Sequence, residues 1–175
     1  MRRLLLVSDH CVHLNTMIMT TTEKQFQITL LVTRVIVGIV VLGHGVQKLF
    51  GWFGGYGFDG TMAFFTDSVG IPYAFGLAII AAETLGMLAL IVGLFGRYFA
   101  ASVIIIMVGA IVTMHVQNGF FMNWSGIASG EGYEFHIILI TLALATVING
   151  SGVYSLDHYI FGTSPDRPNP SFGNV

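Results

Sequence analysis

Four long apolar segments, separated by glycine-rich or polar stretches, dominate the hydrophobic pattern of the chain. They run over residues 28–50, 72–94, 98–116 and 133–150. An α-helix needs roughly 20 residues to cross the hydrocarbon core of a bilayer, and each segment is close to that length. None alternates apolar and polar residues as a half-buried strand does. The pattern therefore predicts an all-α protein, a bundle of four transmembrane helices.

The stretches between the segments mark their ends. Residues 51–70 are rich in glycine and aromatic residues and are expected to form a loop. Gly96 and Arg97 form a tight link between the second and third segments. Residues 118–132 contain asparagine, serine and four glycines, a composition typical of an irregular loop.

Basic residues outside the segments predict the orientation. The stretches 51–70 and 118–132 contain none, whereas five lie elsewhere outside the segments: Arg2, Arg3, Lys24, Arg97 and Arg167. Because cytoplasmic loops of membrane proteins carry an excess of Lys and Arg, both termini are expected in the cytoplasm. The expected location is the inner membrane of a bacterium, which the chain crosses several times.

Composition supports a lipid environment. Hydrophobic residues make up 54% of the chain and charged residues only 9%, against about 25% charged residues in soluble domains. The net charge of −2 with no basic run argues against nucleic acid as a partner. Cys11 is the only cysteine, so the chain cannot form an internal disulfide or a two-thiol redox relay.

We expect one membrane domain over residues 27–160, an N-terminal extension over residues 1–26 and a polar, disordered tail over residues 161–175. The apolar run of residues 4–7 is too short for a signal peptide. Met17 and Met19 directly precede the polar stretch 20–25. Translation is therefore expected to start at one of these methionines, and residues 1–16 are expected to have no function.

Ionisable residues interrupt the apolar segments. They are Arg34, His44 and Lys48 in the first, Glu83 in the second, His115 in the third, and Glu134 and His136 at the start of the fourth. A charge at the centre of a bilayer costs roughly 2.5–3.5 kcal/mol on insertion scales, so such residues tend to be paired or functional. At 100° per residue, the three residues of the first segment fall within about an 80° arc.

Glu83 lies near mid-membrane and is too short to reach either surface. We predict that it forms a structural ion pair with Arg34, because their depths differ by less than the reach of an arginine. His44, Lys48, His115, Glu134 and His136 are expected to lie at similar depths near the outer surface, in a cluster rich in His, Lys and Glu.

Plainer explanations stay open for several of these residues. Arg34 and Lys48 could extend to the membrane surfaces, and His115 and His136 could simply lie at an interface. Glu134 and His136 point about 160° apart on a helix, so at most one of them can face the core.

Metal and nucleotide chemistry are weakly supported. A zinc site usually has closely spaced Cys and His ligands, whereas His44, His115 and His136 lie on different segments. Di-iron bundles use Glu-x-x-His pairs, which are absent. The glycines of residues 51–55 lack the Gly-Lys-Ser/Thr ending of a phosphate loop. We predict no metal site and no intrinsic cofactor.

Short motifs follow one another along residues 28–160. They are Arg34, Gly43-His44-Gly45-x-x-Lys48, Gly70-Ile71-Pro72, Glu83, Gly93 with Arg97, and Gly150-x-Gly152 followed by Ser155-Leu156-Asp157. In this order and spacing, the chain resembles the DoxX family of small bacterial membrane proteins. The runs 118–124 and 130–136 resemble one common branch of that family.

The resemblance implies a role as a subunit of a quinone-linked membrane redox system, an oxidoreductase whose electrons come from a redox partner protein. In that hypothesis His44 and Glu83 are catalytic, and the quinone site is formed by His44, Lys48, Glu83, His115 and Glu134. Two alternatives stay open: a non-catalytic scaffold or assembly factor, and a small transporter in which Glu83 carries protons. Enzyme activity and assembly into a homo-oligomer are also left open.

Overall fold

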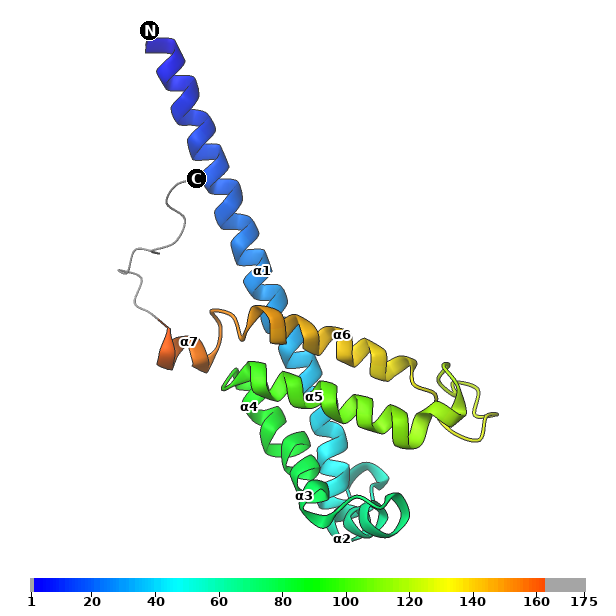
Figure 1. Ribbon diagram of the computed structural model, residues 1–175. Coiled ribbons are helices and arrows are strands. Elements are labelled where there is room, and N and C mark those ends of the chain that lie inside the picture. The colour runs from blue at the N-terminus through cyan, green and yellow to red at the C-terminus, as the bar shows by residue number, and fades with distance from the viewer. Residues whose placement is uncertain (1, 163–175) are drawn as a thin grey trace.

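The computed structural model describes the backbone of residues 2–162 and the side chains of residues 21–162, and its regular elements are all helices and helical turns (Figure 1). Within these residues there is no strand, which confirms the all-α prediction. Three helices are long and apolar enough to cross a membrane: Thr21–Phe50, Tyr73–Val92 and Gly96–Asn118. The fourth predicted segment forms a shorter apolar helix, α6 (Glu134–Asn149).

Two of the long helices contain π-helical turns. Helix α3 (Tyr73–Ala81) continues through the π-helical turn η3 (Ala82–Gly86) into α4 (Met87–Val92). Helix α5 (Gly96–Ala110) continues through the π-helical turn η4 (Ile111–His115) into the 3₁₀ turn η5 (Val116–Asn118). Such turns are rare in proteins overall, and those that do occur are often found at functional sites. Here η3 contains Glu83, and η4 ends at His115.

The helices pack around an apolar core between α1 (Arg2–Phe50), α4, α5 and α6, and α5 lies beside α6 (Figure 1). The buried residues of this core are Val37, Val41, Met87, Leu90, Ala100, Val103, Met107, Leu139 and Ala143. Gly45 brings α1 and η3 into direct contact, because a Cβ atom at this position would overlap the carbonyl group of Glu83. Small residues of this kind let membrane helices approach closely.

The predicted loop over residues 51–70 is wrong. It forms the 3₁₀ turn η1 (Trp52–Gly54), helix α2 (Gly57–Ala63) and the π-helical turn η2 (Phe64–Val69). Met62 and Phe65 are three residues apart and are buried with Ile80 in a second apolar cluster. The high glycine content concealed this short amphipathic pattern.

The ends of the chain also differ from the prediction. Helix α1 begins at Arg2 rather than near residue 28 and continues without a break through the polar stretch before the first apolar segment. Side-chain bonds support the helix there, since Gln27 Nε2 donates to Glu23 Oε1 one turn earlier, at 3.1 Å. The chain after Gly150 folds into an ordered segment that ends in helix α7 (Leu156–Phe161). The predicted disordered tail lies outside the described residues from residue 163 onward.

The segment after α6, residues 150–161, is here called the C-terminal strap. It covers the buried guanidinium of Arg34, which is 1% exposed and donates to the backbone carbonyls of Ser151 and Tyr154. Asp157 fixes the strap to the turn between α4 and α5. Its carboxylate accepts from the backbone N–H groups of Phe95 (2.7 Å) and Gly96 (3.1 Å).

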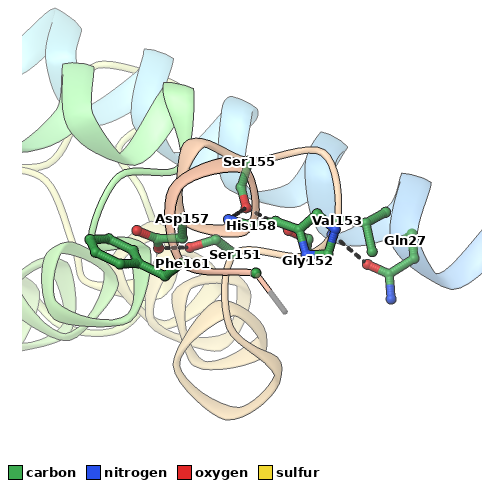
Figure 2. Close-up of a pocket in the computed structure, with 9 residues that line it drawn as sticks. Gln27, Ser151, Gly152, Val153, Ser155, Asp157, His158 and Phe161 are labelled. Carbon is green, nitrogen blue, oxygen red and sulfur yellow. Dashed lines mark hydrogen bonds between the residues drawn. The ribbon is translucent and has the colours of Figure 1, made fainter. Parts of the chain in front are cut away.

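Figure 2 shows the bonds within the strap and from the strap to α1. The hydroxyl of Ser151 donates to Asp157 Oδ2 at 2.6 Å, and the N–H of Val153 donates to Gln27 Oε1 at 3.0 Å. Burial raises the pKa of Asp157, but the hydrogen bonds from Ser151, Gly96 and Phe95 and the positive charge of Arg34 outweigh it and lower the pKa below its ordinary value. Asp157 is therefore a charged acceptor at neutral pH.

We predict that Asp157→Asn destabilises the protein at neutral pH by about 1–3 kcal/mol, because a charged acceptor of several hydrogen bonds is lost. A carboxylate with a lowered folded-state pKa contributes its full stability at neutral pH and loses that contribution as the pH falls below about 4. Acidification should therefore lower the thermal unfolding midpoint of the wild type more than that of Asp157→Asn.

The matched control is Asp59→Asn, which changes an exposed aspartate on α2. It should leave both the unfolding midpoint and its acid dependence unchanged. Equal behaviour of the two variants in lipid nanodiscs would show that the strap does not depend on Asp157.

Candidate functional site

An apolar cavity of about 520 Å³ lies among α1, α3, η3, α5, η4 and α6. Most of its wall is formed by aliphatic and aromatic side chains, among them Phe65, Ile79, Ile106, Met107, Phe135 and Leu139. Six ionisable residues also line it: His44, Lys48, Glu83, Glu131, His115 and His136. The cavity is therefore a hydrophobic chamber in which a few polar groups converge, an arrangement typical of small-molecule sites.

Glu83 and Lys48 form an ion pair in this wall, between Lys48 Nζ and Glu83 Oε2. Glu83 is almost fully buried, whereas the Lys48 side chain is 26% exposed. His44 lies one helical turn before Lys48 and faces the same side of α1. Gly45, between them, lets the backbone of Glu83 pack against α1 at this level.

The predicted ion pair between Arg34 and Glu83 is wrong. Glu83 pairs with Lys48, and Arg34 donates to strap carbonyls at the other end of the core. The contact between Gly45 and Glu83 explains the difference. Gly45 lies 11 residues after Arg34 in the numbering, which is roughly 16 Å along a helix. That distance exceeds the reach of an arginine side chain.

His115 and His136 stand next to one another, on η4 and α6, with ring centroids 4.2 Å apart. His115 Nδ1 lies 2.8 Å from the backbone carbonyl oxygen of Glu131. Because a carbonyl oxygen only accepts, Nδ1 carries the proton and donates it. His136 Nδ1 is buried and has no hydrogen-bond partner in the described part of the chain.

The structure brings four of the five predicted cofactor-binding residues to the cavity: His44, Lys48, Glu83 and His115. Glu134 is not in the wall; its carboxylate accepts from Trp124 Nε1 at 3.4 Å instead. Glu134 and His136 were predicted not to face the core together, and His136 is the one that lines the cavity. No cluster of three or more His, Cys, Asp or Glu residues in the described region is suited to a metal ion.

Sequence reasoning missed His136 and Glu131 as members of the site. His136 is three residues before Leu139, and Leu139, Ala143 and Thr146 form the buried stripe of α6. That spacing of three and four residues was visible in the sequence and places His136 on the buried face. Glu131 lies in the irregular loop before α6, where no periodic pattern indicates which side chains face inward.

Comparison with known proteins agrees with the motifs. The DoxX family model matches residues 29–116. The chain is 30% identical over 139 residues to "Putative oxidoreductase CatD" of Bacillus subtilis (strain 168), an alignment that covers 79% of this chain and 92% of that protein. No solved structure matches. The chain belongs to the DoxX family and is a multi-pass membrane protein. The matched range contains His44, Lys48, Glu83 and His115.

We predict that Lys48→Leu and Glu83→Leu each destabilise the protein by about 3 kcal/mol, since each leaves an uncompensated charge in a low-dielectric environment. The double variant should recover much of the loss. Thermal unfolding in lipid nanodiscs measures the coupling as a double-mutant cycle.

Arg34→Leu combined with Glu83→Leu is the matched control. Arg34 and Glu83 have separate partners, so their losses should add. The observed pairing would be contradicted if the stability losses of the Lys48 and Glu83 variants were additive. It would also be contradicted if the double variant of Arg34 and Glu83 recovered stability.

Proposed function

We propose that this protein is a subunit of a quinone-linked membrane redox system and that the cavity binds the quinone. The observation that carries the proposal is the convergence of Lys48, Glu83 and three histidines in one apolar chamber of about 520 Å³. Sites for small molecules commonly have volumes of roughly 300–1,000 Å³. The name of the Bacillus subtilis relative supports a redox role.

The chemistry of a quinone fits these groups. Its ring and tail are apolar and match the aliphatic and aromatic wall, and its two carbonyl oxygens accept hydrogen bonds. The ammonium of Lys48 is a donor for one carbonyl. Reduction adds two electrons and two protons to give the quinol. His44 and Glu83 are the acid–base groups that would exchange those protons.

The electrons come, in this proposal, from a partner protein that carries a redox cofactor. Cys11 is the only cysteine of the chain, so the protein has no thiol pair of its own to supply them. A relative named as an oxidoreductase is consistent with such a partnership. The chain thus provides the membrane site for the quinone and the route for its protons.

We also propose that the chain crosses the inner membrane of a bacterium four times, with both termini in the cytoplasm. The two connections without Lys or Arg, residues 51–70 and 118–132, would then face outward. Both carry highly exposed aromatic side chains suited to a membrane interface: Phe53, Tyr56, Phe121 and Trp124. Helix α6 spans only roughly 24 Å, so the membrane must thin or the flanking residues must extend the crossing.

A second candidate function is a membrane scaffold or assembly factor. The ion pair between Lys48 and Glu83 favours it, because a buried pair can serve only to hold α1 against η3. In that case the cavity would hold an acyl chain of the bilayer.

The orientation predicts opposite labelling of two introduced cysteines in a Cys11→Ser background. Ser125→Cys, on the exposed loop before α6, should react with an impermeant thiol reagent added to intact cells. Tyr159→Cys, on exposed α7, should react only after the cells are opened. The reverse pattern would invert the topology.

Quinone binding is the direct test of the proposed function. In lipid nanodiscs the wild type should bind decylubiquinone or a menaquinone analogue, and His44→Ala and Lys48→Ala should each weaken that binding about tenfold, the effect of one lost hydrogen bond. Ser125→Ala lies outside the cavity and should bind as the wild type does.

Thermal unfolding of each variant separates a loss of quinone binding from a loss of folding. If Lys48→Ala does not fold, Lys48→Arg takes its place; it keeps the cation and should retain binding. A wild type that binds neither quinone, alone or with copurifying proteins, would assign the protein to the scaffold class.

A further inference from the structure

A line of polar groups leads from the irregular loop before α6 into the cavity. Glu131 is exposed on the loop and also lines the cavity. Its backbone carbonyl accepts from His115, whose ring adjoins that of His136. His136 ends the line at the cavity wall with a buried nitrogen that has no partner within the described residues. The proposed function uses none of these three residues as an acid or base.

We propose that His136 contacts the quinone oxygen directly and that His115 and Glu131 connect it to water on the loop side as a proton route. This inference rests on the proposed function and specifies where its protons enter and leave. His136 is thereby a catalytic residue, and His115 and Glu131 pass protons to it.

The unpartnered nitrogen of His136 is the first argument. Buried polar atoms in proteins are nearly always hydrogen-bonded, to protein or to another molecule. His136 lines a chamber whose wall is otherwise largely apolar, and its Nδ1 has no partner among the described residues, so a molecule bound in the chamber is the partner available to it. An imidazole nitrogen donates to a quinone carbonyl when protonated and accepts from a quinol hydroxyl when not. The same atom therefore suits both redox states.

The tautomer of His115 is the second argument. Its Nδ1–H is held by the carbonyl of Glu131, so in the neutral ring the lone pair is on Nε2 and is free to take a proton. Contact between the two rings places His136 beside this base. A proton passes from water to His115, from His115 to His136, and from His136 to the quinone oxygen. This passage protonates one quinone oxygen, and the acid–base groups of the proposed function, His44 and Glu83, protonate the other. Together with two electrons from the partner protein, these two protons convert one quinone to one quinol.

The loop is built to keep Glu131 in place. The carboxylate of Glu131 accepts from the N–H of Asn123 at 2.8 Å, and its carbonyl also accepts from Asn118 Nδ2 at 3.0 Å. Asn123 in turn exchanges two hydrogen bonds with the backbone of Ala128. The loop thus holds in place both the exposed carboxylate of Glu131 and the Glu131 carbonyl that orients His115.

Other ionisable groups around His136 belong to the same chamber. They are His44 and Lys48 on α1, Glu83 on η3, His115 on η4 and Glu131 on the loop. Lys48 and Glu83 neutralise one another. His44, an acid–base group of the proposed function, is the third histidine of the chamber and interacts electrostatically with His136.

The test uses the full-length protein with isotope-labelled histidines in lipid nanodiscs. Magnetic resonance of the ring nitrogens should show His115 protonated at Nδ1 and a shift of the His136 Nδ1 signal on addition of decylubiquinone. His136→Phe, which keeps a ring, should weaken decylubiquinone binding about tenfold. His136→Gln, which keeps a polar group, should retain part of the affinity and serves if His136→Phe unfolds.

Proton exchange between His136 and water tests the route without any quinone. His115→Phe and Glu131→Gln should slow this exchange about tenfold and leave decylubiquinone affinity within about twofold. His158→Phe, on exposed α7 and outside the cavity, should not slow it.

The outcomes separate the two proposals. Quinone binding that is indifferent to His136 overturns this inference and leaves the proposed function standing. If the rate of proton exchange between His136 and water is unchanged in His115→Phe, the proton route is overturned. No quinone binding by the wild type overturns the proposed function and the substrate contact together.

Discussion

The placement of Glu83 against α1 is the contact on which the bundle and its cavity depend. A carboxylate buried among apolar helices needs a cation, and Lys48 is the partner that α1 supplies. The pair can form only because Gly45 has no side chain, so that the backbone of η3 lies directly on α1. Glu83 lies in the π-helical turn η3 and lines the chamber. One close contact therefore sets the spacing of the first two long helices and the chemistry of the chamber between them.

Two polar networks lie at opposite ends of an apolar core. Arg34, Asp157 and the strap form one, and the Lys48–Glu83 pair with the histidines forms the other. The side chains of Val37, Val41 and Met87 lie between them and are almost completely buried. A proton or an ion cannot pass through such a core without a polar partner. In the proposed route, proton exchange between the chamber and water takes place on the loop side, where Glu131 is exposed.

The sequence predicted the helices well and their mutual register poorly. Hydropathy located the long spans because the lipid-facing surface demands apolar residues over the whole length. The Arg34–Glu83 pair failed because depth along isolated helices ignores which residues let two backbones touch. Gly45 carried that information, and its contact with Glu83 appears only once the helices are assembled.

Short structured segments were the other weakness of sequence reasoning. No helix was predicted after residue 150, although Ser155 caps α7 by accepting from the N–H of His158, a signal typical of a helix start. Residues 51–70 were taken for a loop because glycine content outweighed the spacing of Met62 and Phe65. Both segments are stabilised by contacts with distant parts of the chain, which local composition does not report.

The unpartnered nitrogen of His136 also bears on the choice between a scaffold and a quinone site. A scaffold needs the Lys48–Glu83 pair but no polar group beyond it, and an acyl chain would fill an apolar chamber at little cost. An acyl chain has no donor or acceptor, however, and would leave His136 Nδ1 buried without a hydrogen bond. Such a group costs about 1–3 kcal/mol. A ligand with an apolar body and an oxygen at its head removes that cost while filling the same volume, and a quinone has that form.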